Sequence, residues 1–277
     1  MEIDHVPFAW SDLDDITAEF DRLGLSPDYG GVHDNDVTHM SVLGFDDRSY
    51  LELIAERTDG DHDFWPAHIR ADAGPAAWCL RVPDIVAECK RVLERGIAVR
   101  GPIYGSRERD DGTLVEWDRA EFGDEARRLL LPFAIEDRTP LAYRVSPSAS
   151  VAGGPLVGVG QVVLAVRDLD EGIALFRDVY RFPSPVRAEV EGFGAVAAFP
   201  GRPVALVTPD GEAWLEDRLD RFREGPCAVL LKTTDLAAAG EAYPLLGSSK
   251  WPTGRVAFFD SDVLGHRLGV VEPNGGE

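Results

Sequence analysis

The segment Ile3-Asp4-His5-Val6-Pro7-Phe8 and the segment Tyr50-Leu51-Glu52-Leu53-Ile54 are short apolar stretches, and each carries a polar residue at an unusual position. Their aromatic, leucine and β-branched residues predict two largely buried strands. A charge buried in such a strand needs a partner or a metal ion. His5 and Glu52 are therefore the first candidates for a functional site.

The residues between these two strands complete one structural unit. Residues 13–23 have the apolar spacing of an amphipathic helix, and Asp12 stands where a helix cap is expected. A turn is expected at 28–31, and strands are expected at 39–43 and 50–55. The unit is thus a strand, a helix and about three further strands.

The same order recurs three times along the chain. Further copies begin with strands at 77–82, 159–166 and 228–232, at a period of roughly 70 residues, which indicates repeated supersecondary modules. The last strand of the second copy is expected near 128–134. A Pro- and Gly-rich run at 146–155 predicts a linker. The sequence therefore predicts a domain at 1–145 with modules 1–75 and 76–145, the linker, and a second domain at 156–277.

Acidic residues dominate the charge of the 277-residue chain. It contains 49 Asp and Glu against 28 Lys and Arg, for a formal net charge of −21, and its lysines are Lys90, Lys232 and Lys250. Salt relieves self-repulsion at such a charge, so we expect a halophilic protein adapted to a high-salt cytoplasm. An ordinary acidic protein is the alternative. The charge argues against nucleic acid or an anionic membrane as a partner.

Composition and cysteine content indicate a soluble, reduced protein. Hydrophobic residues make up 44% of the chain, but no apolar run approaches the ~20 residues that span a bilayer. The N-terminus lacks the pattern of a signal peptide. Cys79, Cys89 and Cys227 form no CxxC pair, which favours buried thiols over disulfides or a zinc site. We expect a cytoplasmic protein, either a monomer or a homodimer.

The module order and several short motifs resemble the vicinal oxygen chelate superfamily, and more specifically its glyoxalase-like domain family. The resemblance covers about the first 140 residues and depends on Ile3-Asp4-His5, Gly30-Gly31-Val32-His33, Thr38-His39, Tyr50-Leu51-Glu52-Leu53 and Leu131-Pro132-Phe133. It implies an α+β fold of four βαβββ modules, which form two glyoxalase/bleomycin-resistance-type domains with cup-shaped mixed sheets. One fold hosts many chemistries, so the reaction stays open.

The resemblance also implies a metal site, because metal-dependent members take ligands from the first and last strands of paired modules. His5 and Glu52 stand at those positions in the first module, where they would bind a divalent ion such as Mn, Fe, Ni or Zn. Glu52 is also a candidate base. His39, or else His33, is the candidate third ligand. Alternatively, His5 and Glu52 pair with each other or with an arginine.

The second module lacks equivalents of these ligands. Alignment places Ala77 opposite His5 and puts Leu130 or Leu131 near the position of Glu52, so a four-ligand site is absent. The second half also lacks them, which indicates a degenerate or structural domain. The second module is instead expected to supply part of the wall of a pocket that binds a small-molecule substrate. The candidate wall residues are Trp78, Arg81, Tyr104, Trp117 and Phe133 of this module, together with His33 of the first. Its aromatic residues could equally belong to the core.

Three functions fit this reading. The first is a small-molecule enzyme, with metal-dependent lyase, isomerase or dioxygenase chemistry on an oxygen-bearing substrate. The second is a metal-free binding or sequestering protein of the bleomycin-resistance type. The third is a structural role, which would require both cups to be filled. His62 and His68 are expected to be solvated.

Overall fold

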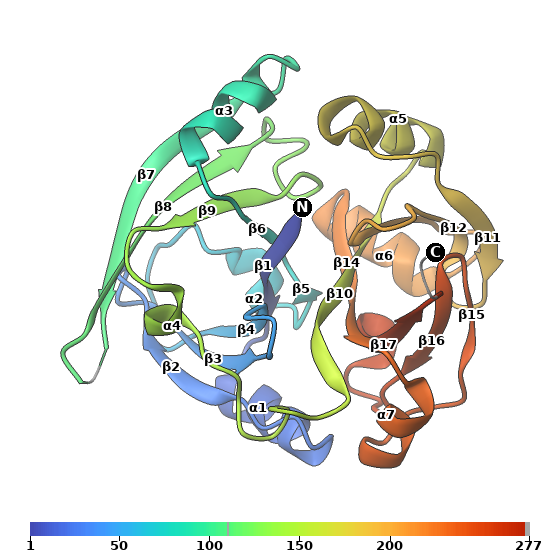
Figure 1. The fold of residues 1–277 in the computed structure, drawn as a ribbon, viewed down its shortest axis with the longest axis horizontal. Helices are drawn as coiled ribbons and strands as arrows, with labels where there is room; N and C mark the ends of the chain where they lie inside the picture. The colour runs from blue at the N-terminus through green and yellow to red at the C-terminus, as the bar shows by residue number, and fades with distance from the viewer. Residues whose placement is uncertain (110, 275–277) are drawn as a thin grey trace.

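Two curled β-sheets lie side by side, one from each half of the chain (Figure 1). They are seen in a computed structural model, which describes residues 1–109 and 111–274. Each sheet contains two βαβββ modules, and the first strands of the two modules are antiparallel neighbours in its middle. The predicted α+β fold of four modules in two cup-shaped sheets is confirmed.

The sheet of the first half has the strand order β2-β3-β4-β1-β6-β9-β8-β7, with β5 beside β1. The elements of this half are β1 (Glu2–Ala9), α1 (Leu13–Arg22), β2 (Asp28–Val32), β3 (Thr38–Gly44), β4 (Tyr50–Glu56), α2 (Pro66–Ile69), β5 (Gly74–Pro75), β6 (Cys79–Arg81), α3 (Ile85–Leu93), β7 (Val99–Glu108), β8 (Leu114–Phe122), β9 (Phe133–Asp137) and α4 (Leu141–Arg144).

The sheet of the second half repeats the arrangement in the order β11-β12-β13-β10-β14-β17-β16-β15. Its elements are β10 (Leu156–Ala165), α5 (Leu169–Tyr180), β11 (Val186–Val190), β12 (Gly194–Ala198), β13 (Val204–Thr208), α6 (Ala213–Phe222), β14 (Gly225–Thr233), α7 (Leu236–Ala242), β15 (Ser249–Trp251), β16 (Gly254–Phe258), the 3-10 helix η1 (Gly265–Arg267) and β17 (Leu268–Pro273).

An aspartate begins the first long helix of every module. Asp12, Asp84, Asp168 and Asp235 each occupy the N-cap of a helix, and their side chains accept hydrogen bonds from backbone N–H groups of the first turn. These bonds satisfy N–H groups that have no partner within the helix. The repeated strand–Asp–helix pattern in the sequence therefore reflects one repeated local structure.

Two predicted boundaries differ from the structure. Residues 28–31, predicted as a turn, belong to the edge strand β2, where Gly31 has a φ of +104° and the register with β3 shifts between Tyr29 and Gly31. The glycines thus make an irregularity within a strand. The last strand of the second module, expected near 128–134, begins only at Phe133.

The two halves share one hydrophobic core. A single cluster of buried side chains includes Phe8 and Trp78 from the first half and Val162 and Phe176 from the second, and the rings of Trp78 and Phe176 lie 6.3 Å apart. The predicted linker is packed as well, since Ser148 is buried and its hydroxyl donates to Asp28. The division into 1–145, 146–155 and 156–277 stays a prediction.

The interior of the second sheet is largely filled by protein. Leu215 and Leu219 of α6 pack into one buried cluster with sheet residues such as Val196 and Trp251. Gln161, which aligns with His5, accepts a hydrogen bond from Trp251 Nε1 at 2.7 Å. Side chains of α6 thus occupy much of this interior, while Gln161, Thr253 and Val271 line a cavity of about 770 Å³ that also reaches residues of the first half.

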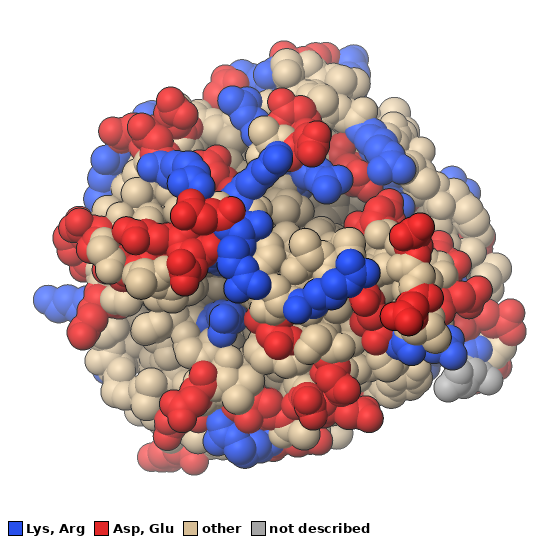
Figure 2. Space-filling view, turned by 180° about the vertical axis from the view of Figure 1, so that it is seen from behind, with Lys and Arg blue, Asp and Glu red and all other residues tan. Residues whose placement is uncertain are grey.

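Acidic side chains are scattered over the surface, and a group of Lys and Arg side chains lies near the middle of the face drawn in Figure 2. Within the described residues, no helix combines the length and the apolar character needed to cross a membrane. Cys79, Cys89 and Cys227 are buried free thiols, as expected.

Candidate active site

A pocket of about 230 Å³ opens on the concave face of the first sheet, and both His5 and Glu52 line it. Side chains alternate between the two faces of a strand. In β4, Tyr50 and Glu52 face the pocket while Leu51 and Leu53 enter the core between sheet and helices. The parallel register of β1 and β4 pairs His5 with Tyr50. The two predicted residues thus lie on the same face.

His5 is held from behind by the carboxylate of Asp4. The His5 Nδ1 atom lies 2.7 Å from Asp4 Oδ1, and the imidazole ring stacks on Tyr50 with centroids 4.6 Å apart. Because an ionised carboxylate can only accept a hydrogen bond, Nδ1 of His5 is the donor in this pair. Nε2 is then left to face Glu52, whose Oε2 lies 3.9 Å away.

Glu52 connects His5 to a second histidine. The Nε2 atom of His33 lies 3.3 Å from Glu52 Oε1, and its Nδ1 atom lies 2.9 Å from the hydroxyl oxygen of Thr38. Burial acts to raise the pKa of Glu52, but His33, His5 and Arg107 outweigh it and lower that pKa to about 2. Glu52 is therefore a carboxylate at neutral pH, with an Nε2 atom on either side.

A network of buried charges lies beneath His5, Glu52 and His33. Arg144 donates to both oxygens of Asp4, at 2.6 and 2.7 Å, and to both oxygens of Asp137, at 2.7 and 3.0 Å. Burial acts to raise the pKa of Asp4, but Arg144 and His5 lower it well below its usual range. Asp4 is therefore ionised, and its position is fixed.

Aromatic side chains form most of the pocket wall. Phe64 and Trp65 come from the segment between β4 and α2, and Trp117 and Phe133 come from β8 and β9. Tyr104 also contacts the pocket, but it is 51% exposed and its hydroxyl donates to Glu116. The structure thus places His33, Tyr104, Trp117 and Phe133 around the same pocket as His5 and Glu52, and their roles there stay a prediction.

His39 lies outside the pocket, because alternate side chains of β3 point to opposite faces of the sheet. It pairs with Ala55 in the antiparallel register of β3 and β4, whereas the neighbouring residues Met40 and Val42 pair with Ile54 and Glu52. His39 therefore points to the opposite face from Glu52 and stands near Tyr29. His33, the other candidate third ligand, is the histidine that meets Glu52.

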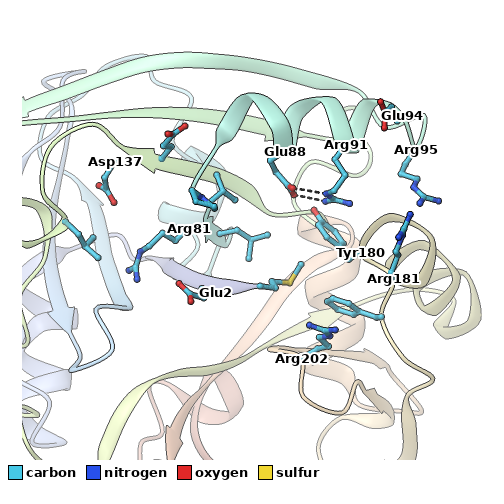
Figure 3. A pocket seen from close by; sticks show the side chains of 17 residues that line it. Glu2, Arg81, Glu88, Arg91, Glu94, Arg95, Asp137, Tyr180, Arg181 and Arg202 are labelled. Atoms are coloured by element: carbon cyan, nitrogen blue, oxygen red, sulfur yellow. Dashed lines mark hydrogen bonds and ion pairs between the residues drawn. The ribbon is translucent and has the colours of Figure 1, made fainter.

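Trp78 and Arg81 do not line this pocket either. Trp78 is fully buried in the core, where its Nε1 donates to the Leu130 carbonyl. Arg81 donates to Asp4 from the other side and lines a separate cavity of about 920 Å³, in which Arg91 pairs with Glu88 (Figure 3).

The position opposite Glu52 in the second module also needs correction. Leu130 and Leu131 belong to core clusters. The residues of β9 that face the pocket are Phe133 and Ile135. The conclusion that no carboxylate matches Glu52 there is unaffected.

Two histidines expected to be solvated are enclosed. The side chain of His62 is fully covered and lies 3.0 Å from Glu56. His68 stacks on Phe222 of the second half, and burial, helped by Arg218 and Arg128, lowers its pKa to about 3. The acidic composition of their segment gives no sign that it folds back on the sheet.

Several pocket residues were not identified from the sequence. Arg107 and Arg119 lie in strands of mixed composition, and Arg144 lies in the short helix α4. Phe64 and Trp65 stand in a segment without periodicity. Only Asp4 had a signal, because it directly precedes His5 in an apolar strand.

The donor atoms at the pocket can be tested against a divalent metal. A group whose ligand atoms lie within 4.8 Å of one another is Asp4, His5 and Cys79. Asp4 is already bound by Arg144 and Arg81, and burial raises the pKa of the Cys79 thiol well above its usual range. An ion there would have to displace a guanidinium and deprotonate a buried thiol, so this group fits poorly.

His5, Glu52 and His33 fit better by chemistry. Two imidazoles and one carboxylate are the protein ligands of mononuclear iron oxygenases, and imidazole and carboxylate also suit other divalent ions. The Asp4–His5 bond is the kind of outer contact that orients a ligating imidazole. Ligands about 2.1 Å from one ion lie about 3 Å apart. His33 lies 3.3 Å from one oxygen of Glu52 and His5 lies 3.9 Å from the other, and the three residues are not a group whose ligand atoms all lie within 4.8 Å of one another. Side chains would therefore have to move to close this set around one ion.

Comparison with known families identifies this fold. The sequence model described as "Glyoxalase-like domain" matches residues 3–171, which is more than half of the chain. The chain belongs to the glyoxalase-like domain family. The match includes β1 and β4, which carry His5 and Glu52, and it extends through β10 into α5. No curated protein sequence matches the chain.

Solved structures of low sequence identity share the fold of this glyoxalase-like protein. A hypothetical protein from Staphylococcus aureus has a TM-score of 0.60 at 15% identity, over 84% of this chain and 92% of that one. A 4-hydroxymandelate synthase mutant from Streptomyces coelicolor has a TM-score of 0.57 at 13% identity, over 100% and 93% of the respective chains. A xylose isomerase-like TIM barrel/4-hydroxyphenylpyruvate dioxygenase fusion protein has a TM-score of 0.58 at 16% identity, and this chain spans 49% of it.

Proposed function

We propose that this protein is a divalent-metal-dependent enzyme acting on a small molecule, with its active site in the first half of the chain. The main observation in its favour is that the carboxylate of Glu52 lies between the Nε2 atoms of His5 and His33 in an aromatic pocket. Mn, Fe, Ni or Zn suits these ligands. The bound ion would supply Lewis-acid or redox chemistry at a substrate oxygen.

The side chains of the site have separate roles in this proposal. Asp4 keeps the Nδ1 proton on His5, so that Nε2 faces the pocket. Glu52, ionised at neutral pH, is a ligand and can also accept a proton from a substrate carbon or hydroxyl. The aromatic wall excludes water from the bound substrate, as in other small-molecule sites. Lyase, isomerase and dioxygenase reactions all fit this arrangement.

A metal-free binding protein is the second candidate. It is favoured by the contacts that Glu52 already makes with His33 and His5, which give the buried carboxylate polar partners without an ion. In that case the pocket would bind or sequester a small molecule. The largely filled interior of the second sheet agrees with a supporting role for that half under either candidate.

Metal uptake separates the two candidates. The protein would be purified without chelators or affinity nickel, and its metal content would be measured as isolated and after incubation with Mn, Fe, Ni or Zn. We expect about one equivalent, held by the three-ligand set, and its loss in His5→Ala, Glu52→Gln and His33→Ala. His39→Ala is the matched control, because His39 lies on the same sheet but faces away. If the folded parent takes up none of these metals, the binding-protein function replaces the enzyme.

A further inference from the structure

Three arginines line the pocket, and they differ in whether a carboxylate of the protein already pairs with them. A guanidinium has five N–H donors. Arg144 uses all of them, because it donates to Asp4, Asp137 and the Tyr50 hydroxyl. Arg119 donates to Glu121 at 3.2 Å. Neither of these two is a free cation in the pocket.

Arg107 is the exception. It projects from β7 into the pocket, where one terminal nitrogen donates to the Gly30 carbonyl and the other to the Arg144 carbonyl at 3.3 Å. Within the described residues, no carboxylate forms an ion pair with it, whereas the nearby Arg109 and Arg144 have such partners. Three of its five donors have no protein partner there.

This environment makes an incoming anion favourable. Arg107 is partly enclosed, and burial lowers its pKa below the usual value, although Tyr50 and Glu52 act in the opposite direction. It still carries its charge at neutral pH. Arg107 is partly buried and its hydrogen-bond partners are only carbonyl groups, so a bidentate anion would satisfy both its charge and its open donors.

The size and shape of the pocket restrict the ligand further. A volume of 230 Å³ corresponds to about eight water molecules at about 30 Å³ each, which suits one ring with a short side chain. Trp117 and Phe133 offer flat apolar surfaces from neighbouring strands. Glu52 would repel a second negative charge, and Arg144 is already neutralised by two aspartates.

We propose that the pocket binds small planar monocarboxylates, with the ligand carboxylate on Arg107 and its flat apolar part against Trp117 and Phe133. This deepens the proposed function by naming its substrate class, and it uses the same pocket without requiring the metal ion. The fork of a guanidinium matches a carboxylate better than a lysine ammonium does. Anchored in this way, the rest of the ligand extends toward His5 and Glu52.

Ligand binding tests the inference without a known reaction. Benzoate and trans-cinnamate would be titrated by calorimetry and by the fluorescence of the pocket tryptophans, with benzamide and inorganic phosphate as comparison ligands. We expect the parent to bind the acids and to bind benzamide and phosphate far more weakly. Arg107→Met should weaken acid binding by about 10- to 100-fold, the scale of a charge-assisted bidentate contact. Arg107→Lys should recover only part of it.

Arg109→Met is the matched control, because Arg109 follows the same strand but is largely exposed and outside the pocket. It should leave acid binding unchanged. Circular dichroism and melting curves would establish that each variant is folded. Equal acid binding by the parent and Arg107→Met overturns the inference, and so does equal binding of benzoate and benzamide or a parent that binds neither acid.

The same titrations with and without chelator keep this inference separate from the proposed function. Acid binding that needs Arg107 but persists in a protein that takes up no metal would support the inference and remove the metal-dependent enzyme. Acid binding that is lost in His5→Ala and with chelator, but is unaffected in Arg107→Met, would place the carboxylate on the ion. That result would overturn the inference and support the proposed function.

Discussion

Asp4 and His5 are consecutive residues of β1, yet their side chains meet, with Asp4 Oδ1 only 2.7 Å from His5 Nδ1. In a regular strand they would point to opposite faces. The register between β1 and β6 shifts between Ile3 and His5, and such an irregularity re-aims a side chain. A local break in the sheet thus places a buried carboxylate behind the imidazole.

Replacing Asp4 should test this arrangement. Asp4→Asn removes the charge that faces the buried Arg144, so we expect a loss of about 3–5 kcal/mol in the free energy of unfolding. Asp118→Asn, which affects a pair with the half-exposed Arg138, should cost less than about 1 kcal/mol. Urea denaturation at neutral pH measures both. Equal losses would contradict the buried network.

His68 should make the protein sensitive to mild acid. Its pKa is about 3 in the folded protein because it is buried, with Arg218 and Arg128 adding to the effect, against a usual value of 6.5. The unfolded chain therefore binds a proton that the folded protein does not. The associated stability is complete above pH 6.5 and is lost toward pH 3, at up to about 1.4 kcal/mol per pH unit.

The variant His68→Phe isolates this contribution, because a phenyl ring can keep the stacking on Phe222. Denaturation curves at several pH values between neutral and about pH 4.5 would be compared. We expect stability to fall less steeply in the variant than in the parent. Parallel curves would mean that His68 is readily protonated in the folded protein.

Unfolding should be a single transition in spite of the two sheets. Side chains of both halves share one core, and Arg218 of α6 donates to the carbonyl groups of Ala73 and Pro75 in the first half. Calorimetry should give one peak with matching calorimetric and van't Hoff enthalpies. Two separated peaks would show that the halves are independent.

Arg218 itself should contribute to this coupling. Arg218→Met leaves two buried carbonyl groups without donors, for a loss of about 1–3 kcal/mol in the free energy of unfolding. Arg221→Met, on the exposed side of the same helix, is the control and should change stability by less than about 0.5 kcal/mol. A similar effect for both variants would exclude a special role for Arg218.

Salt should stabilise the protein if its charge is an adaptation to a saline interior. The net charge of −21 makes the folded state self-repelling, and added ions screen that repulsion. We expect the melting temperature to rise between about 0.05 and about 1 M KCl, where the screening length shortens. An unchanged or falling melting temperature would favour an ordinary acidic protein.

Gly105 gives a way to disturb the pocket wall alone. A Cβ atom at this position would lie 2.6 Å from Trp117 Nε1, so Gly105→Ala should displace the indole ring and not the backbone. We expect altered tryptophan fluorescence and weaker benzoate binding, with the fold preserved. Gly240→Ala, where a Cβ has no neighbour within 4 Å, is the control.

The fold could be predicted from the sequence because each module repeats local signals that need no distant information. The aspartate caps, the apolar helix faces and the alternating strands fix the order of elements, and the repeat fixes their grouping. The exception was Gly30-Gly31, whose composition favours a turn although β3 pairs with it as an edge strand. The late start of β9 at Phe133 likewise depends on its partner β6.

The candidate site could be predicted only in part, because it depends on register and on distant segments. The sequence favoured His39 over His33 as the third ligand, and only the pairing of β3 with β4 shows that His39 points away from Glu52. Trp78 is apolar enough for either face of the sheet. Arg107 approaches the pocket through β7, far from His5 along the chain, and nothing local marks it.

Helix α6 fills much of the second cup, so the two module pairs of this chain differ in what they offer to a ligand. A cup that is filled with its own side chains gives up ligand binding, and its residues are then free to change as long as the filling is kept. Arg218 of the same helix also donates hydrogen bonds to backbone carbonyl groups of the first half, next to β1. The first half can thus keep the candidate site while the second half supports it structurally.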